Sequence, residues 1–255
     1  MVHCLPPCGF SRCYVLSDRE GLAVVDVGSV GAAEDAVRFI TGQPGLSMAQ
    51  VRFVLATHFH VDHIGGVARF LEFCAPGTKV FLTTLAIQYL QGQRKLCSLK
   101  GWGTGFLSAA VASMGYVRRL SHLNFGSLAG IPLPILRDHC DIGVDADRIF
   151  PLDGAGRKRY PLGFGGWDVV ETPGHTEDSI CLYQEAEGRL LTGDTILNLD
   201  AARGPELNRF CWNKQEIHRS FDRLKAELSP RVLYPGHGEA YSNNGENVLS
   251  CVRGG

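Results

Sequence analysis

One short stretch decides the fold: Ala56-Thr57-His58-Phe59-His60-Val61-Asp62-His63-Ile64-Gly65-Gly66. It follows a mostly apolar run, Val51–Leu55, which is typical of a buried strand. Three imidazoles and one carboxylate within six residues are the kinds of ligand that bind a borderline divalent cation. Clustered histidines at the end of a strand have no evident packing role, so the stretch predicts a metal site.

The spacing within the stretch refines this prediction. Residues two apart on an extended strand point the same way, so His58 and His60 can converge on one ion. Asp62 and His63 are adjacent and cannot share that direction, which favours a neighbouring second ion for them. Gly65 and Gly66 would allow a helix, expected from Gly65 to Phe73, to begin close to the strand ends.

Composition excludes several function classes. The chain has 255 residues, 45% hydrophobic and 20% charged, and its net charge is −1. These values are ordinary for a globular protein with a full core, and they provide no basic field for nucleic acid or an anionic membrane. No apolar run approaches the ~20 residues that span a bilayer. The N-terminus lacks the pattern of a signal peptide, so we expect a cytoplasmic protein.

The nine cysteines are scattered and odd in number, which predicts reduced, mostly buried thiols. Four ligand-type residues lie closer together near the start: His3, Cys4, Cys8 and Cys13. A structural metal there is one interpretation, although the spacing matches no zinc finger or ribbon. A disordered start that leads into a strand is the other interpretation.

Strand and helix patterns recur in two similar sets. The first set predicts a hairpin, a helix and two further strands at Cys13–Ser17 with Leu22–Asp26, Ala32–Ile40, Arg52–Thr57 and Lys79–Leu82. The second predicts strands at Trp167–Thr172, Ser179–Tyr183, Arg189–Thr192 and Arg231–Tyr234, and a helix at Lys214–Leu228. No linker divides the chain, so we expect a single domain over residues 1–255 made of two similar halves.

Residues 84–148 interrupt this pattern. Strand signals are sparse there and helical stretches such as Leu107–Met114 dominate, which indicates an insertion that could form a lid, a pocket wall or a dimer contact. The insertion carries five basic residues: Arg94, Lys95, Lys100, Arg118 and Arg119. They form either a solvated basic face or a binding surface for an acidic substrate.

Three more candidate ligands each come directly after a β-rich run, in a turn beside glycine: His175, Asp194 and His237. Functional groups of α/β proteins gather where strands end and loops begin. With the opening stretch they make seven ligand-type side chains at four strand ends, enough for two ions. His58, His60 and His175 would hold the first ion, Asp62, His63 and His237 the second, and Asp194 would bridge them.

These motifs carry a family resemblance. Thr57-His58-Phe59-His60-Val61-Asp62-His63, with Pro173-Gly174-His175-Thr176, Gly193-Asp194-Thr195 and Pro235-Gly236-His237, resembles the metallo-β-lactamase superfamily over roughly residues 13–241. The resemblance implies an α/β fold, a four-layer αβ/βα sandwich with the site at the sheet edges. It also implies a two-metal site that agrees with the ligand assignment above.

Such a site predicts a hydrolase for a small-molecule thioester, ester or lactone, similar to glyoxalase II. Two divalent ions, zinc in the first place and iron or manganese otherwise, can share a hydroxide that attacks a carbonyl. Asp62 would orient the nucleophile and Asp194 would bridge the ions. No separate general acid is identifiable, and Thr57 and Thr176 would support the ligands or form turns.

Alternatives within the family remain open. Asp194 stands where true β-lactamases have a cysteine ligand or an open site. Acyl-homoserine lactonases often carry a tyrosine three residues after the bridging acid, where this chain has Leu197. A phosphodiesterase or nuclease would be expected to show more basic surface. An iron-dependent oxygenase or redox enzyme is compatible with the ligands, although the diiron flavoprotein branch has a glutamate where this chain has His60.

Overall fold

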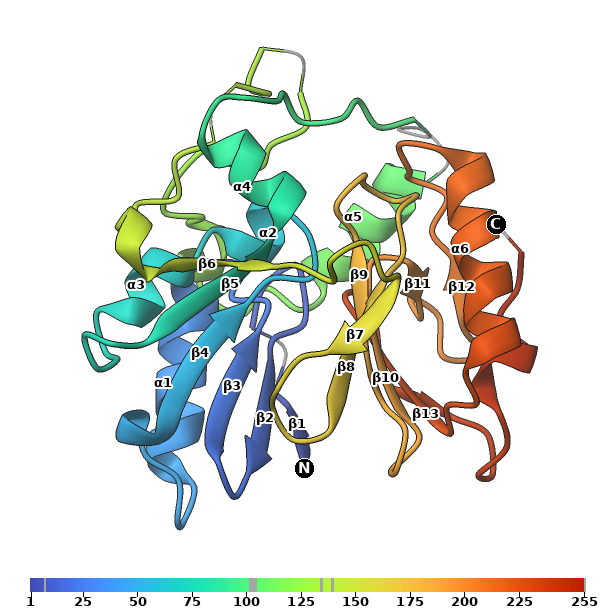
Figure 1. Cartoon of the computed structure of the whole chain (residues 1–255), viewed down its shortest axis with the longest axis horizontal. Helices are drawn as coiled ribbons and strands as arrows, with labels where there is room; N and C mark the ends of the chain where they lie inside the picture. Colours follow the sequence, from blue (N-terminus) through green and yellow to red (C-terminus); the bar gives the residue numbers. More distant parts are fainter. Residues whose placement is uncertain (7, 101–104, 134, 139, 255) are drawn as a thin grey trace. The chain divides into compact units, whose positions relative to one another are not determined.

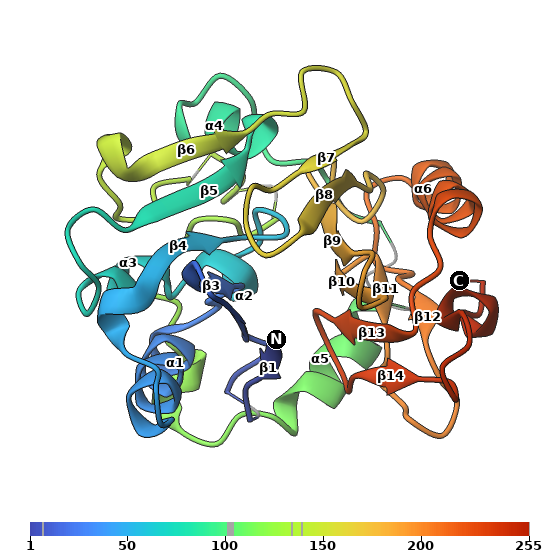
Figure 2. The same ribbon diagram turned by 60° about the horizontal axis from the view of Figure 1, so that its bottom comes forward.

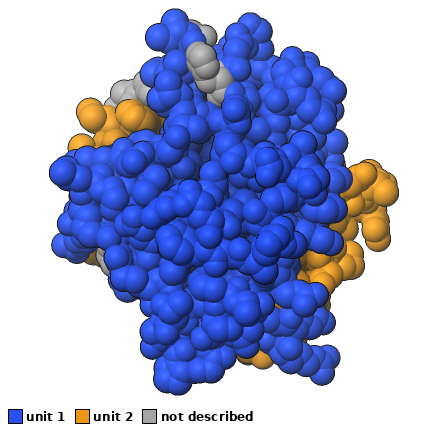
Figure 3. All heavy atoms as spheres, turned by 90° about the vertical axis from the view of Figure 1, so that its left-hand side faces the viewer, with its two compact units in different colours: residues 1–96, 114–152 blue, residues 97–113, 153–255 orange. Residues whose placement is uncertain are grey.

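The protein is described from a computed structural model that covers residues 1–6, 8–100, 105–133, 135–138 and 140–254. The chain clusters into two compact units, coloured separately in Figure 3. Unit 1 comprises Met1–Leu96 and Met114–Leu152, and unit 2 comprises Cys97–Ser113 and Asp153–Gly255. The prediction of a single domain stays a prediction, whereas the two sets of strands and helices are found, one set in each unit.

Unit 1 is built on a six-stranded sheet in the order β1-β2-β3-β4-β5-β6 (Figure 1). Its strands are β1 (Val2–Cys4), β2 (Tyr14–Asp18), β3 (Gly21–Val25), β4 (Val51–Leu55), β5 (Lys79–Thr83) and β6 (Ile149–Leu152). The predicted hairpin is β2–β3, with Asp18 paired to Gly21 across the turn. The strands from β3 to β6 are parallel, so β3, β4 and β5 deliver their carboxyl ends to one edge of the sheet.

Helices of unit 1 pack on one face of this sheet. They are α1 (Val30–Gly42), α2 (Val61–Ile64), α3 (Val67–Leu71) and α4 (Thr84–Leu90). Ala33, Ala36 and Ile40 of α1 share an apolar core with alternate strand residues such as Val24, Val54 and Val80. In Figure 2, α4 lies beside β5 and β6, which it contacts. Sheet and helices together form one αβ pair of layers.

Two expectations for unit 1 were wrong in detail. The helix expected from Gly65 to Phe73 begins at Val61 and is broken, so Asp62 and His63 lie on α2 and not in an extended segment. A Cβ atom at Gly66 would lie 2.1 Å from the carbonyl oxygen of Ser29, so the chain passes too close to α1 for a side chain there. The start of the chain is also ordered, because β1 pairs with β2.

Unit 2 repeats the plan with the sheet order β14-β13-β10-β9-β8-β7. Its strands are β7 (Arg159–Pro161), β8 (Trp167–Glu171), β9 (Ile180–Gln184), β10 (Arg189–Gly193), β13 (Val232–Pro235) and β14 (Tyr241–Ser242). Helix α6 (Lys214–Glu227) buries Ile217, Phe221 and Leu224 against this sheet, which confirms the predicted helical face. Two short strands, β11 (Ile196–Leu197) and β12 (Glu206–Leu207), pair with each other outside the large sheet.

The segment between β5 and β6 contains the predicted helix Leu107–Met114 and other short helices, but most of its described residues lie in turns and loops. It contains α4, α5 (Leu107–Met114) and two short 3₁₀ helices, η3 (Leu120–Leu123) and η4 (Ala146–Arg148). In the described part of this segment the one strand-like feature is an isolated bridge from Lys100 to Cys211. The segment contributes to both units, because Cys97–Ser113 belongs to unit 2 and the remainder to unit 1.

Two further expectations concern cysteines and membranes. Six of the nine thiols are buried, and burial raises the pKa of Cys8 to about 12 and that of Cys181 to about 11. Among the described residues, no group suited to hold an ion includes His3, Cys4, Cys8 or Cys13, so the metal interpretation of this early cluster gains no support. The helices that the structure describes are too short or too polar to cross a bilayer.

Candidate metal centre

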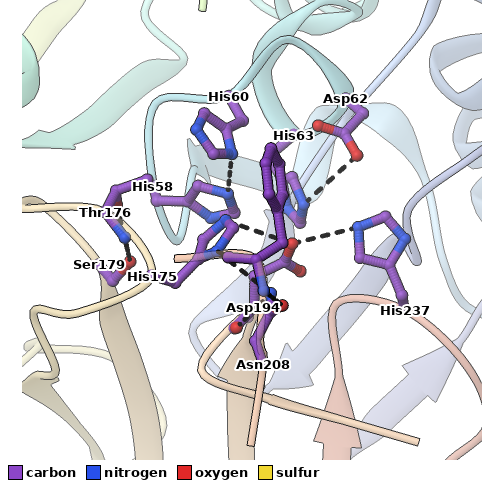
Figure 4. A network of polar contacts seen from close by, with 12 residues as sticks. His58, His60, Asp62, His63, His175, Thr176, Ser179, Asp194, Asn208 and His237 are labelled. Atoms are coloured by element: carbon purple, nitrogen blue, oxygen red, sulfur yellow. Dashed lines mark hydrogen bonds and ion pairs between the residues drawn. The ribbon is translucent and has the colours of Figure 1, made fainter. Parts of the chain in front are cut away.

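His58 and His60 follow β4 at the sheet edge of unit 1, where the sequence predicts them. Both side chains are buried, and Nε2 of His58 lies 3.0 Å from Nδ1 of His60 (Figure 4). Nδ1 of His58 contacts the Thr57 hydroxyl at 3.2 Å, which leaves Nε2 as its ligand atom. Two ring nitrogens that face each other at this distance are suited to a common cation.

Asp26, at the end of β3, holds two of the histidines in place. Its carboxylate accepts hydrogen bonds from the backbone N and the hydroxyl of Thr57, both at 2.8 Å. Its Oδ2 lies 3.0 Å from Nδ1 of His63. Asp26 is buried and has a φ of 59°, a left-handed conformation that is uncommon outside glycine. It therefore orients His63 directly, and His58 through Thr57.

Asp62 and His63 occupy the first turn of α2. His63 is fully buried, and its Nε2 lies 3.9 Å from Oδ2 of Asp62 (Figure 4). The Asp62 side chain is 23% exposed, so it is the one predicted ligand that is not buried. Its backbone oxygen accepts a hydrogen bond from Ser11, and a Cβ at Gly28 would lie 1.7 Å from that oxygen. The α2 turn is thus held tightly against the loop after β3.

Unit 2 brings the other three predicted ligands together. His175 follows β8, Asp194 follows β10 and His237 follows β13, and all three are buried. Oδ2 of Asp194 lies 3.5 Å from Nε2 of His175 and 3.2 Å from Nε2 of His237 (Figure 4). One carboxylate oxygen therefore lies between two imidazoles, the position expected of a bridging ligand.

The outer nitrogens of these imidazoles have partners that sequence reasoning missed. His175 Nδ1 donates to the carbonyl of Phe210 at 2.6 Å, and His237 Nδ1 contacts the hydroxyl of Ser113 at 2.9 Å. The Asn208 amide donates to the Asp194 carbonyl at 3.0 Å. These contacts leave Nε2 of each histidine as the ligand atom. A serine on an insertion helix and an asparagine in a loop carry no sequence signal of such roles.

Thr176 and Gly236 lie beside two of the predicted ligands of unit 2 and keep these ligands in place. The Thr176 hydroxyl contacts that of Ser179 at 2.7 Å, which closes the turn after His175. A Cβ atom at Gly236 would lie 2.2 Å from Oδ1 of Asp194. A glycine before His237 is therefore needed for the carboxylate to keep its place.

The side chains fit divalent metal ions. All seven predicted residues offer ligand atoms to groups that could hold an ion. Five imidazoles and two carboxylates suit zinc, iron or manganese better than the all-oxygen sites of magnesium or calcium.

Two of the insertion's basic residues are engaged away from the ligands. Lys95 forms an exposed ion pair with Asp138 at 2.8 Å, and Arg119 pairs with Glu34 and Asp35 on α1. His122 of the insertion also lies 2.8 Å from Asp35. Lys95 thus fits the solvated interpretation, and Arg119 anchors η3 to α1.

Comparison with curated proteins finds metallo-hydrolases and a thioesterase. The "Probable metallo-hydrolase YybB" of Bacillus subtilis is 22% identical over 242 residues, 94% of this chain and 86% of that protein. "Probable metallo-hydrolase YqjP" of the same organism is 37% identical over 86 residues, 30% of this chain. "Thioesterase pkgB" of Emericella nidulans is 38% identical over 84 residues, 33% of this chain. The two shorter matches span about a quarter of those proteins, 25% and 22%.

Solved structures share the fold at low sequence identity. The metallo-beta-lactamase family protein TTHA1429 of Thermus thermophilus matches with a TM-score of 0.58 and 22% identity, covering 98% of this chain and 75% of that one. A structure described as a peroxy diiron species of the chemotaxis sensor ODP matches with a TM-score of 0.59 and 15% identity, covering 97% and 85%.

The chain also matches the model of a protein family described as the "Metallo-beta-lactamase superfamily". This match agrees with the fold and with the ligand residues described above. It covers residues 6–82 and 149–237, more than half of the chain, and leaves out the whole of the predicted insertion, residues 84–148. All seven predicted ligands lie inside the matched ranges. The fold expected from the sequence is confirmed by the solved structures. The chain belongs to the metallo-β-lactamase superfamily.

Proposed function

We propose that this protein is a hydrolase with two metal ions that cleaves a thioester, ester or lactone of a small molecule. His58, His60 and His175 would hold one ion, Asp62, His63 and His237 would hold the other, and Asp194 would serve both. The observation that carries the proposal is the position of Asp194 Oδ2 between the Nε2 atoms of His175 and His237. Zinc is the first choice of metal, and iron and manganese suit the same donors.

The chain's own groups have defined tasks in this reaction. When bound, two such ions supply a nucleophilic hydroxide at neutral pH and polarise the carbonyl under attack. Asp62 is the most exposed ligand, so its carboxylate can accept a hydrogen bond from the nucleophile and orient it. Asp26, Asn208 and the Phe210 carbonyl keep the ligands oriented before substrate arrives.

Two observations support the proposed type of scissile bond: the residue at position 194 and the name of one relative. The resemblance to the superfamily implies that an aspartate at position 194, in place of a sulfur ligand, is typical of its glyoxalase II-like thioester hydrolases and lactonases. The name of pkgB, a thioesterase, supports the thioester. A lactonase of the acyl-homoserine type is the alternative within the same chemistry, and Leu197 in place of tyrosine counts against it.

Metal content and turnover test the proposal together. We expect about two ions per chain, and we expect Asp194→Ala to lose bound metal and turnover together. Asp222→Asn, an exposed residue paired with Lys225 on α6, is the matched control. Hydrolysis by Asp194→Ala at the wild-type rate would refute the mechanism.

A substrate panel separates the bond types. Thioesters, lactones and phosphodiesters are assayed with the zinc, manganese and iron forms, and oxygen consumption is followed with the iron form. Thioester or lactone turnover supports the proposal. Turnover of phosphodiesters alone, or oxygen consumption without hydrolysis, would replace it with a nuclease or with a redox enzyme resembling ODP.

A further inference from the structure

Unit 2 contains a cavity of about 340 Å³ next to its metal ligands. Its walls come from the β11–β12 segment, from α5 and from the C-terminal Arg253. The volume lies at the lower end of the range for small-molecule sites, about 300–1,000 Å³. A short organic chain fits such a space, and a large cofactor does not.

Two residues connect this cavity to the ligands of the same unit. Asn208 lines the cavity, and its amide donates to the Asp194 carbonyl at 3.0 Å. Ala112 also lines it, and the next residue along α5, Ser113, contacts His237. A molecule in the cavity would therefore have one end close to Asp194 and His237.

The cavity wall is apolar in one part and charged in another. Leu197, Leu199 and Leu207 form the apolar part, which favours an aliphatic segment. The charged part has three arginines and two acids: Arg203, Arg209, Arg253, Asp200 and Glu206. At neutral pH this leaves one positive charge in excess.

The three arginines of the wall share two carboxylates, because Arg203 pairs with Asp200 at 3.4 Å. Arg209 and Arg253 share the single carboxylate of Glu206, at 3.6 and 3.1 Å. The buried Nε of Arg253 has no hydrogen-bond partner among the described residues.

The Arg253 backbone is fixed, because its N donates to the Pro205 carbonyl and its carbonyl accepts from Leu207, both at 3.0 Å. Its guanidinium is positioned by Glu206 and by the Gly204 carbonyl, to which Nη2 donates at 3.4 Å. A positioned guanidinium with an unused donor favours a carboxylate.

We propose that this cavity binds the acyl part of the substrate, and that this part is a short aliphatic chain ending in a carboxylate. The leucines contact the chain, Arg253 binds the carboxylate, and the scissile carbonyl lies at the Asn208 end. This inference rests on the proposed hydrolase function, whose substrate class it narrows.

Binding measurements test the cavity without turnover. Adipate and hexanoate are titrated calorimetrically into the metal-loaded protein, because they have the same chain length and differ only in the second carboxylate. We expect adipate to bind about tenfold tighter than hexanoate, and Arg253→Gln to abolish this preference. Arg219→Gln, an exposed arginine of α6 paired with Glu216, should keep it. Equal affinity for both acids in the wild type overturns the proposal.

Kinetics test the same preference during reaction. The S-phenyl monothioesters of hexanoate and of adipate carry the same uncharged S-phenyl group and release the same thiophenolate, so any preference belongs to the acyl part. The KM for the adipoyl thioester should be about tenfold lower, and Arg253→Gln should remove this ratio while Arg253→Lys keeps part of it. Equal KM values with rapid hydrolysis would overturn the acyl cavity and leave the hydrolase intact. Selective adipate binding without hydrolysis of either thioester would support the cavity and refute the hydrolase.

Discussion

The hydroxyl of Ser113 lies 2.9 Å from Nδ1 of His237, and both residues are buried. His237 therefore presents Nε2 toward Asp194 with its ring fixed by a residue of the insertion. The contact ties α5, which lies outside the segments matched to the family, to a predicted metal ligand.

Ser113→Ala should weaken binding of one of the two ions by about tenfold, because the His237 ring loses the contact that orients it. Competition with a chromophoric chelator measures the two affinities separately. Ser113→Thr retains the hydroxyl and should recover most of the loss. Val111→Ala, an exposed change on the same helix, is the control and should leave both affinities unchanged. If Ser113→Ala binds both ions as the wild type does, the contact does not orient the ligand.

Asp26→Asn should lower the affinity for both ions by about tenfold or more, since Asp26 supports His58 through Thr57 and His63 directly. Asparagine tolerates the left-handed backbone at this position, but its amide cannot accept from both neighbours. Metal titration measures the effect, and circular dichroism checks that the fold is retained. A loss of one ion alone would show that Thr57 holds His58 without help from Asp26.

Gly236→Ala should displace the Asp194 carboxylate, because the added methyl would lie 2.2 Å from Oδ1. Metal content per chain should fall, and hydrolysis should fall with it. Gly77→Ala is the matched control, since a Cβ atom there meets nothing within 4 Å. Elemental analysis of the two purified variants makes the comparison. Full metal content in Gly236→Ala would mean that the carboxylate has room to move.

The ionisation of the Asp35 carboxyl should make the free energy of unfolding depend on pH. Burial alone would raise the pKa of its carboxyl, but hydrogen bonds from Arg38 and His122 and the charge of Arg119 outweigh burial, so the pKa lies below the ordinary value of 3.8. The stabilisation is therefore present above the unfolded-state pKa and is lost as the pH falls through the lower folded-state value.

Asp35→Asn should lower the free energy of unfolding by about 1 kcal/mol at pH 6, a value that allows for solvent screening of this half-exposed network, and the difference should shrink below about pH 4. Urea unfolding of both proteins at several pH values measures it. Asp18→Asn, an exposed turn residue of the β2–β3 hairpin, is the control. A difference that grew on acidification would contradict the assigned sign.

The sequence predicted those strands and helices whose pattern of apolar residues follows directly from their burial. Mostly continuous apolar runs located β2, β3 and β4, because these strands are buried on both faces. The period of Ile217, Phe221 and Leu224 located α6, because a helix buried on one face requires that spacing. The four places in the chain where the seven ligand-type residues occur were also visible, since a strand precedes each of them. Their binding of metal ions as assigned stays a prediction.

The missed features depend on contacts between residues distant in sequence. Val2–Cys4 is too short to show a pattern, and it is a strand because β2 offers a free edge for it. Helix α2 begins at Val61 because Ser11 and Gly28 lie against the backbone of Asp62, which no local periodicity reveals. Asp26 gave a partial signal, an acid at the end of an apolar strand. Ser113 and Asn208 gave none.

Ala112 and Ser113 are consecutive residues, and one lines the cavity while the other contacts His237. If the cavity binds the acyl part as proposed, changes in α5 that admit a different acyl chain would also shift His237, a predicted metal ligand. We then expect substrate specificity and metal loading to change together when this helix changes. An engineer who exchanges residues 105–114 between relatives should select for retained metal first and for new substrates second.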